Sequence, residues 1–374
     1  MLHPLSRARR DDIVALKDVR DQDIPIRLLS NLITRSRIPN GLLFWGASGV
    51  GKSMTAIAFA KAINCNESPD DSCGTCLSCR KIDNGNHPDI IEVAPVKKAR
   101  IIDVEAIENM IEMASLRPYE ADWRIFIIHE ADRMRGPAQN RLLKTLEEPL
   151  GPSVFILVSE YPQLLLPTIR SRCQRIRFRS LHPDTVKDLV LRERDIAPDL
   201  AEAISGIAQG QMSRALDLVD SDKRAMVFEI IEQFQRGEDP LFVAEEFASY
   251  VSTQKAAIEG YVKSEAPSVD VKEVSKEDRE RMKEEQMALV DALSRRNILE
   301  FLYLLEMWYR DVMVYGATGD ASQVLNKDQL SLLEQANTDD PQAKIGAIEK
   351  ARLYLERFLN EERVFRDLFF VLAR

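Results

Sequence analysis

The sequence predicts an α/β domain, with a parallel sheet covered by helices, followed by a region built only of helices. Between about Pro39 and Phe178, short apolar runs alternate with segments whose apolar residues recur at helical spacing. Near-continuous apolar strands separated by helices are typical of a parallel sheet buried on both faces. From Leu181 onward the apolar residues recur at helical spacing alone. We therefore expect one α/β domain and further helical domains.

The expected strands and helices of the first part follow one another in a regular order. The strands are GLLFWG at 41–46, DIIEVAP at 89–95, RIFIIHE at 124–130 and SVFILVS at 153–159. The helices are SMTAIAFAKAI at 53–63, IIDVEAIENMIEMASL at 101–116 and GPAQNRLLKTLEE at 136–148, the last closed by Pro149. This alternation indicates strand–helix–strand units.

The pattern divides the chain into three predicted parts. Residues 1–179 form the α/β domain, 180–221 a small helical lid, and 222–374 a helical C-terminal domain. Within the last part, residues from about 263 to 286 are charged and poor in apolar side chains, with Pro267 among them. Such a segment is either a solvated linker or an exposed helix.

Charge and composition exclude several classes of protein. A net charge of −9 argues against a chain that coats DNA by itself, because phosphate neutralisation needs clustered lysine and arginine. No apolar run approaches the roughly 18–20 residues that span a bilayer. The first residues are basic but lack the apolar stretch of a secretory signal. We expect a cytoplasmic protein without membrane partners.

A phosphate-binding loop is the clearest motif. Residues 46–53 read GASGVGKS, which fits the pattern G-x-x-x-x-G-K-[ST] between a strand and a helix. Glycines such as Gly46, Gly49 and Gly51 let successive backbone N–H groups turn inward around phosphate oxygens. Lys52 can reach the β- and γ-phosphates, and the Ser53 hydroxyl can ligate Mg²⁺. The alternative is a glycine-rich turn without ligand, and we expect nucleotide binding.

Four of the five cysteines are clustered. Cys65, Cys73, Cys76 and Cys79 have the spacing C-x7-C-x2-C-x2-C, whereas Cys173 stands apart. Two-residue gaps let a tight turn present two thiolates to one ion, and Zn²⁺ prefers four such ligands in a tetrahedron. The sequence predicts a structural zinc site in an insertion at 65–79, with a disulfide or free thiols as the alternative.

These motifs together resemble the bacterial DNA polymerase III clamp-loader subunits, which are AAA+ proteins. The matching segments occur in the family's order: 41–53, the cysteine insertion, NHPDI at 86–90, IFIIHEADRM at 125–134, NRLLKTLEEP at 140–149 and LLPTIRSRCQRIRF at 165–178. Details such as ADRM and the later LLEMWYRDVMVYG are more similar to the delta-prime branch than to gamma/tau.

The resemblance implies an AAA+ P-loop domain, a helical lid and a helical collar that holds five subunits together in a hetero-pentameric ring. The ring opens a sliding clamp and sets it on primed DNA. The expected cofactors are ATP or ADP, Mg²⁺ and structural Zn²⁺. A collar would pack on sister subunits through apolar residues at helical spacing, or these would form its own core: Leu302, Leu305, Trp308 and Val312.

The resemblance also implies roles for single residues. Glu130 matches the acid that orients the attacking water, and Arg172 matches the arginine finger that acts in trans on the neighbouring subunit's ATP. Arg214, in GQMSRAL, matches the lid arginine that senses the nucleotide. Ser159 lies near the polar sensor position, although Glu160 beside it is unusual there.

One position departs from the family pattern. His129 stands where an aspartate usually supplies negative charge near Mg²⁺. A neutral imidazole offers one acceptor and no charge, so the loss is on the order of 1.5–3 kcal/mol. We therefore expect a delta-prime-like stator that binds nucleotide with little hydrolysis. The alternatives are a gamma/tau-like ATPase motor and, outside the family, an enzyme that transfers phosphate to a small substrate.

Overall fold

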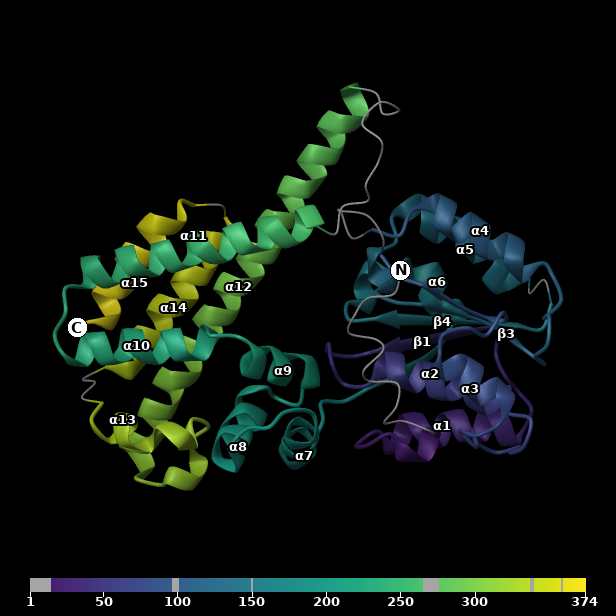
Figure 1. The fold of residues 1–374 in the computed structure, drawn as a ribbon, viewed down its shortest axis with the longest axis horizontal. Helices are drawn as coiled ribbons and strands as arrows, with labels where there is room; N and C mark the ends of the chain where they lie inside the picture. The colour runs from purple at the N-terminus through teal and green to yellow at the C-terminus, as the bar shows by residue number, and fades with distance from the viewer. Residues whose placement is uncertain (1–14, 96–100, 149–150, 265–275, 337–339, 358) are drawn as a thin grey trace. The chain divides into compact units, whose positions relative to one another are not determined.

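The computed structural model describes residues 15–95, 101–148, 151–264, 276–336, 340–357 and 359–374 (Figure 1). The chain divides into two compact units. The first, here the P-loop unit, runs to Thr185 and includes Gly210–Ser213. The second, here the helical unit, contains Val186–Gln209 and Arg214–Arg374. The predicted lid is divided between them, and the three-part division remains a prediction.

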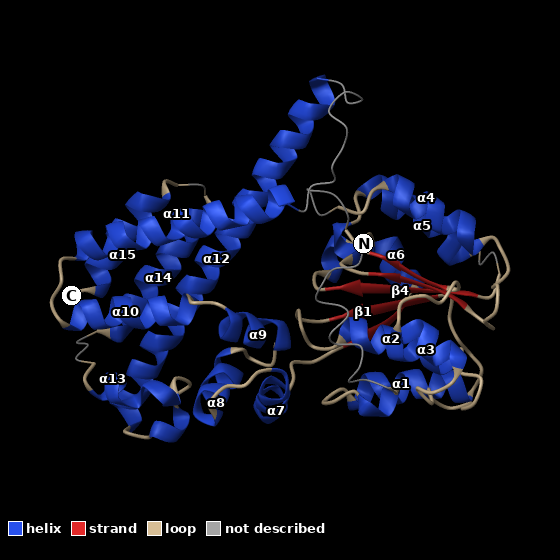
Figure 2. Cartoon of the chain, viewed as in Figure 1, coloured by secondary structure: helices blue, strands red, loops and turns tan. Residues whose placement is uncertain are grey.

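The P-loop unit contains a five-stranded parallel sheet, drawn in red in Figure 2. Its strands are β1 (Gly41–Trp45), β2 (Ile90–Val93), β3 (Arg124–Ile128), β4 (Ser153–Ser159) and β5 (Gln174–Arg177). They lie in the order β2-β3-β4-β1-β5. The four expected strands are confirmed, and β5 is an edge strand that the apolar pattern did not reveal.

Helices cover both faces of this sheet, as Figure 2 shows. They are α1 (Asp23–Thr34), α2 (Lys52–Ile63), α3 (Leu77–Asp83), α4 (Val104–Ala114), α5 (Gly136–Glu147) and α6 (Pro167–Arg172). One buried cluster joins α1 and α2 to one face, and a second joins α4, α5 and α6 to the other. The predicted α/β fold class, with a parallel sheet covered by helices on both faces and helices after it, is confirmed.

Local sequence signals set several helix starts. The Asp103 carboxylate accepts a hydrogen bond from the backbone N of Ala106 and caps α4. Proline occupies the first turn of α5 and of α6, where its missing N–H leaves no intrahelical hydrogen bond unmade. The helix α2 begins directly after Gly51, so the phosphate loop leads straight into its first turn.

The remaining α-helices follow the sheet in the chain. They are α7 (Pro183–Glu193), α8 (Pro198–Ile207), α9 (Met212–Asp220), α10 (Lys223–Gln235), α11 (Pro240–Ser264), α12 (Lys276–Thr318), α13 (Leu330–Glu334), α14 (Pro341–Glu356) and α15 (Glu361–Leu372). Short 3-10 helices lie at Leu16–Asp18, Ala131–Arg133, Pro162–Leu164, Ala321–Gln323 and Lys327–Gln329. The region after the sheet is therefore helical, as the periodicity predicts.

The core of the helical unit is rich in aromatic residues. The ring of Phe247 lies 4.2 Å from that of Phe301 and 4.8 Å from that of Phe365. The four residues expected on a collar surface, Leu302, Leu305, Trp308 and Val312, are all buried within this unit. They form its own core, which is the alternative stated with the collar expectation, and the collar itself remains a prediction. Helical spacing cannot distinguish a core face from an interface face.

The charged stretch at about 263–286 is partly helical. Its residues from Lys276 belong to α12, and Glu280, Lys283 and Glu284 within that part have exposed side chains. Residues 265–275, including Pro267, lie outside the described residues. Among the described residues, no helix combines the length and apolar composition needed to cross a membrane.

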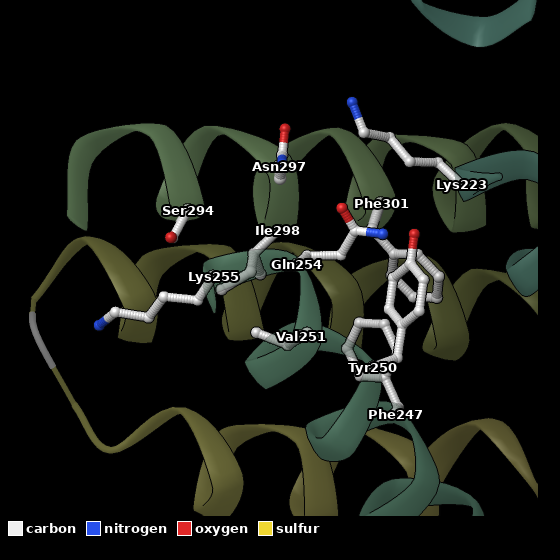
Figure 3. Close-up of a pocket in the computed structure, with 10 residues that line it drawn as sticks. All are labelled: Lys223, Phe247, Tyr250, Val251, Gln254, Lys255, Ser294, Asn297, Ile298 and Phe301. Carbon is white, nitrogen blue, oxygen red and sulfur yellow. The ribbon is translucent and has the colours of Figure 1, made fainter. Parts of the chain in front are cut away.

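The helical unit also holds a small pocket, shown in Figure 3. Phe247 and Phe301 form part of its wall, with Lys255 and Ser294 also lining it. Its volume is about 20 Å³. A space of that size holds about one water molecule, so this pocket is too small for a nucleotide.

Candidate nucleotide-binding site

The backbone of the phosphate loop requires its glycines. Gly49 has φ +71° and Gly51 has φ +91°, both in the left-handed region that glycine tolerates best. A Cβ on Gly49 would lie 2.4 Å from the Ser213 hydroxyl oxygen, and one on Gly46 would lie 2.4 Å from the Phe178 carbonyl oxygen. The glycine pattern thus follows from close packing as well as from backbone conformation.

Lys52 lies inside this loop. Its Nζ donates hydrogen bonds to the carbonyl oxygens of Gly46, at 2.8 Å, and Ala47, at 2.5 Å. Burial lowers the pKa of Lys52 to about 8, against the opposing attraction of Glu160 and Asp132. The lysine is therefore held where the motif places it, at the centre of the loop.

Three side chains form a hydrogen-bonded row beside the loop. The Ser53 hydroxyl oxygen lies 3.1 Å from Nδ1 of His129. On the other side of the ring, Nε2 of His129 lies 2.9 Å from a carboxylate oxygen of Glu92. The row joins the start of α2, the end of β3 and the edge strand β2. Sequence reasoning identified Ser53 and His129 but missed Glu92.

Strand alternation explains why these side chains meet. On β3, Ile125 and Ile127 face the cluster that contains α2, so His129, two residues further on, continues that face. On β2, Ile90 packs against the same cluster, which puts Glu92 on the α2 side as well. Glu92 could have been found as the acidic residue that interrupts the apolar run of the expected second strand.

Other acidic residues follow β3. Glu130 has left-handed backbone angles, φ 47° and ψ 48°, and its carboxylate lies 2.8 Å from Nε of Arg133. Asp132 accepts hydrogen bonds from the Ser159 hydroxyl, at 2.6 Å, and from the backbone N of Glu160, at 3.1 Å. The hydroxyl of Ser159 is therefore directed at Asp132, which the sequence reading did not single out.

Arg172 is the last residue of α6 and is partly exposed. Its guanidinium forms an ion pair with Glu147, at the end of α5, and donates to the Thr168 carbonyl oxygen at 3.3 Å. The side chain is 36% exposed, so the ion pair leaves part of the guanidinium accessible. Its role as an arginine finger remains a prediction.

Arg214 belongs to the helical unit and bonds within it. Its Nε lies 2.9 Å from a carboxylate oxygen of Glu300, and its guanidinium lies over the Tyr303 ring at 4.3 Å. Both partners are on α12. The assignment of Arg214 as a nucleotide sensor stays a prediction.

The cysteine cluster is assembled in the P-loop unit. The four Sγ atoms of Cys65, Cys73, Cys76 and Cys79 all lie within 4.8 Å of one another. Zn–S bonds of about 2.3 Å give tetrahedral edges of about 3.8 Å, so a small contraction fits the ion. Hydrogen bonds, led by that from the Thr75 hydroxyl, lower the pKa of Cys73 to about 6. Four cysteine donors at this spacing are compatible with a structural zinc ion.

Cys173 differs from this cluster. Cys173 is buried in the apolar cluster that includes α5 and α6, and burial raises the pKa of its thiol to about 12. A buried thiol of this kind behaves as a small apolar side chain.

Comparison with known proteins agrees with the motifs. Residues 21–182 match the family model described as "DNA polymerase III, delta subunit". The DNA polymerase III subunit delta′ of Bacillus subtilis is 34% identical over 215 residues, which cover 55% of this chain and 63% of that protein. The DNA polymerase III subunit tau of Bacillus subtilis is 32% identical over 210 residues, covering 54% and 37%.

A solved structure aligns over most of the chain. The gamma-subunit-related protein of DNA polymerase III from Thermotoga maritima covers 93% of this chain and 98% of its own, with 15% identity and a TM-score of 0.43. The chain spans less than two thirds of the two Bacillus subtilis relatives. Over residues 21–182 the chain is similar to the family described as DNA polymerase III, delta subunit, and the two Bacillus subtilis relatives are DNA polymerase III subunits delta′ and tau.

Proposed function

We propose that this chain is a delta-prime-like clamp-loader subunit that binds nucleotide but hydrolyses it slowly or not at all. In the ring it supplies Arg172 to the nucleotide site of a neighbouring subunit. The ring acts on a sliding clamp and primed DNA. The observation that carries the proposal is the position of His129 between Ser53 and Glu92, where an acid would serve hydrolysis.

Nucleotide binding is supported by the loop. Its left-handed glycines turn backbone N–H groups inward, and Lys52 lies at its centre. Such a loop at a helix N-terminus binds phosphate through backbone donors and the helix dipole. These contacts do not depend on an acid at position 129. We therefore expect ATP and ADP to bind.

Weak hydrolysis is supported by the residues after β3. His129 brings no negative charge when its ring is neutral, and a charged ring would repel a cation. Losing one charge-assisted contact costs on the order of 1.5–3 kcal/mol. Glu130, the expected water-orienting acid, is paired with Arg133. Both features favour a site that holds nucleotide without rapid turnover.

Action in trans is supported by Arg172. The guanidinium is always charged and offers a planar fork of donors, which suits the charge that develops on a transferring phosphoryl group. Glu147 holds the side chain at the end of α6 while leaving it partly exposed. An arginine that completes a neighbour's site needs both a charged, planar group and an accessible position.

A gamma/tau-like motor is the second candidate. The complete phosphate loop and the presence of Glu130 favour it, and the tau relative matches nearly as much of the chain as delta′ does. A motor would require turnover that depends on Lys52 and Glu130.

The test of the stator proposal is Arg172→Ala in a loader reconstituted with partner subunits, clamp and primed DNA. An arginine finger contributes about a thousandfold or more at the site it completes, so total ATP turnover should fall sharply. Arg172→Lys should not rescue it, because an ammonium cannot reproduce the planar fork. Arg175→Ala, on the exposed side of β5, is the matched control and should keep normal turnover. Unchanged turnover in Arg172→Ala would refute the proposal.

A further inference from the structure

The ring of His129 lies beside the hydroxyl that the motif assigns to the cation of a bound nucleotide. We propose that Ser53 and His129, backed by Glu92, form a cation site that favours cobalt or manganese over magnesium. The inference rests on the proposed nucleotide binding and adds the class of metal that accompanies the nucleotide.

The first step is the orientation of the ring. A carboxylate can only accept hydrogen bonds, so the 2.9 Å contact with Glu92 requires Nε2 of His129 to carry the hydrogen. In the neutral ring the lone pair is then on Nδ1, which faces the Ser53 oxygen. Carboxylate–histidine pairs of this kind orient metal-binding histidines in proteins and raise their basicity.

The second step is spacing. Neighbouring ligands of an octahedral cation with bonds of about 2.1 Å lie about 3.0 Å apart. The separation between Nδ1 of His129 and the Ser53 oxygen is 3.1 Å. The separation of the two atoms therefore matches that of neighbouring ligands on one cation.

The third step is chemistry. Magnesium is a hard cation that prefers oxygen ligands, whereas imidazole nitrogen binds transition metals increasingly well from manganese through cobalt to nickel. Glu92 is bonded to the far nitrogen of the ring, and Asp132 accepts hydrogen bonds from Ser159 and Glu160. The side chain that contacts the Ser53 hydroxyl is thus a nitrogen donor in the position of the usual acid.

The probes must avoid the cysteine cluster. Four thiolates would take up zinc strongly, so added zinc cannot report on His129. Manganese binds thiolates weakly and gives an electron paramagnetic resonance signal, which makes it the spectroscopic probe. Cobalt, with higher affinity for nitrogen, is the second probe and is added to zinc-loaded protein.

The experiment measures ATP affinity of the full chain by calorimetry with magnesium, manganese or cobalt. The preference is the ratio of the magnesium Kd to the cobalt Kd, divided by the same ratio for His129→Asp. That division removes the intrinsic preference of ATP for each metal. We expect a preference of about tenfold or more. Glu92→Gln should lower it, and Glu112→Gln, an exposed carboxylate on α4, should leave it unchanged.

Pulsed electron paramagnetic resonance of the manganese–ATP complex provides a direct signature. The wild-type chain should show coupling to an imidazole nitrogen that disappears in His129→Asp. Equal ratios in the wild type and His129→Asp, or no nitrogen coupling, would overturn the metal proposal while nucleotide binding stands. Absence of ATP binding with every metal would overturn the proposed function and this inference together.

Discussion

Asp89 gives the most quantitative prediction about the P-loop unit. This residue precedes β2 and is completely buried, and it accepts hydrogen bonds from the backbone N of Tyr119, Glu120 and Ala121 at 2.7, 2.9 and 3.1 Å. It also accepts from Arg124, whose Nη2 lies 2.8 Å away. The network fixes the starts of β2 and β3, the two strands that later present Glu92 and His129.

The expected cost of Asp89→Asn follows from this burial. The change removes the negative charge and leaves the guanidinium of Arg124, itself only 7% exposed, without its counter-ion. Removing one partner of a buried ion pair costs about 3–5 kcal/mol. Arg124→Met should cost a similar amount. The double variant Asp89→Asn/Arg124→Met should cost less than the sum of the two single changes, because no unpaired charge is then left buried.

The pH dependence has a definite sign. Burial by itself raises the pKa of Asp89, but the hydrogen bonds from Glu120, Tyr119 and Arg124 hold that pKa below its ordinary value of 3.8. A depressed carboxyl pKa contributes stability that is present above pH 3.8 and is lost as the pH falls through the folded-state pKa. The difference in unfolding free energy between the wild type and Asp89→Asn should therefore become smaller as the pH falls below 3.8.

The assay is hydrogen–deuterium exchange of peptides from β2 and β3, supported by urea denaturation followed by circular dichroism. Peptide resolution separates the P-loop unit from the helical unit, which need not unfold in the same transition. Asp122→Asn changes an exposed carboxylate in the same loop and should leave exchange unchanged. A decrease of less than about 1 kcal/mol in the unfolding free energy of Asp89→Asn would refute the reasoning, because removing one partner of a buried ion pair costs about 3–5 kcal/mol.

Three further predictions concern the sites. Cys79→Ser should abolish bound zinc in metal analysis of the purified chain, whereas Cys173→Ser should retain it; equal zinc content in both would contradict the assigned cluster. Gly49→Ala, at φ +71°, should weaken ATP binding about tenfold or more in calorimetry, and normal affinity would show that the loop tolerates a side chain. Arg214→Ala should reduce the ratio of ATP to ADP affinity, and Glu300→Gln, which releases Arg214 from its ion pair, should increase it; a ratio that moves in neither variant would refute the sensor role.

The sequence was most informative where one physical signal dominates. The apolar runs at β1, β3 and β4 predicted a buried parallel sheet because strands covered on both faces need apolar residues at every position. The strand β5 was missed because it lies at the edge of the sheet. Its exposed Arg175 and Arg177 alternate with buried Ile176, so it lacks a continuous apolar run.

The site was predictable in part for the same reason. The phosphate loop and the cysteine cluster are local in sequence, so spacing alone indicates their chemistry. The contact of Glu92 with His129 joins residues 37 positions apart and depends on the order of the strands. The Ser159–Asp132 hydrogen bond likewise requires β3 and β4 to be neighbours. Without the strand order, sequence reasoning had no basis for either pairing.

The collar residues show a different limit. Leu302, Leu305 and Trp308 recur at helical spacing, which predicts one buried face of a helix. Helical spacing predicts that this face of the helix is buried, but it does not predict whether the same chain or another subunit covers it. In this chain the covering surface is supplied by its own helices, with Phe228 packing edge-on against Trp308 at 5.6 Å.

The central claim is that His129 separates nucleotide binding from hydrolysis, and the direct test measures both on one sample of the purified chain. ATP labelled at the γ-phosphate is added with magnesium and, separately, with manganese, and bound nucleotide and released phosphate are followed together. We predict binding that is lost in Lys52→Ala, with phosphate release no faster than in that variant. Phosphate release that is well above this background and falls sharply in both Lys52→Ala and Glu130→Gln would contradict the claim and identify the chain as a motor.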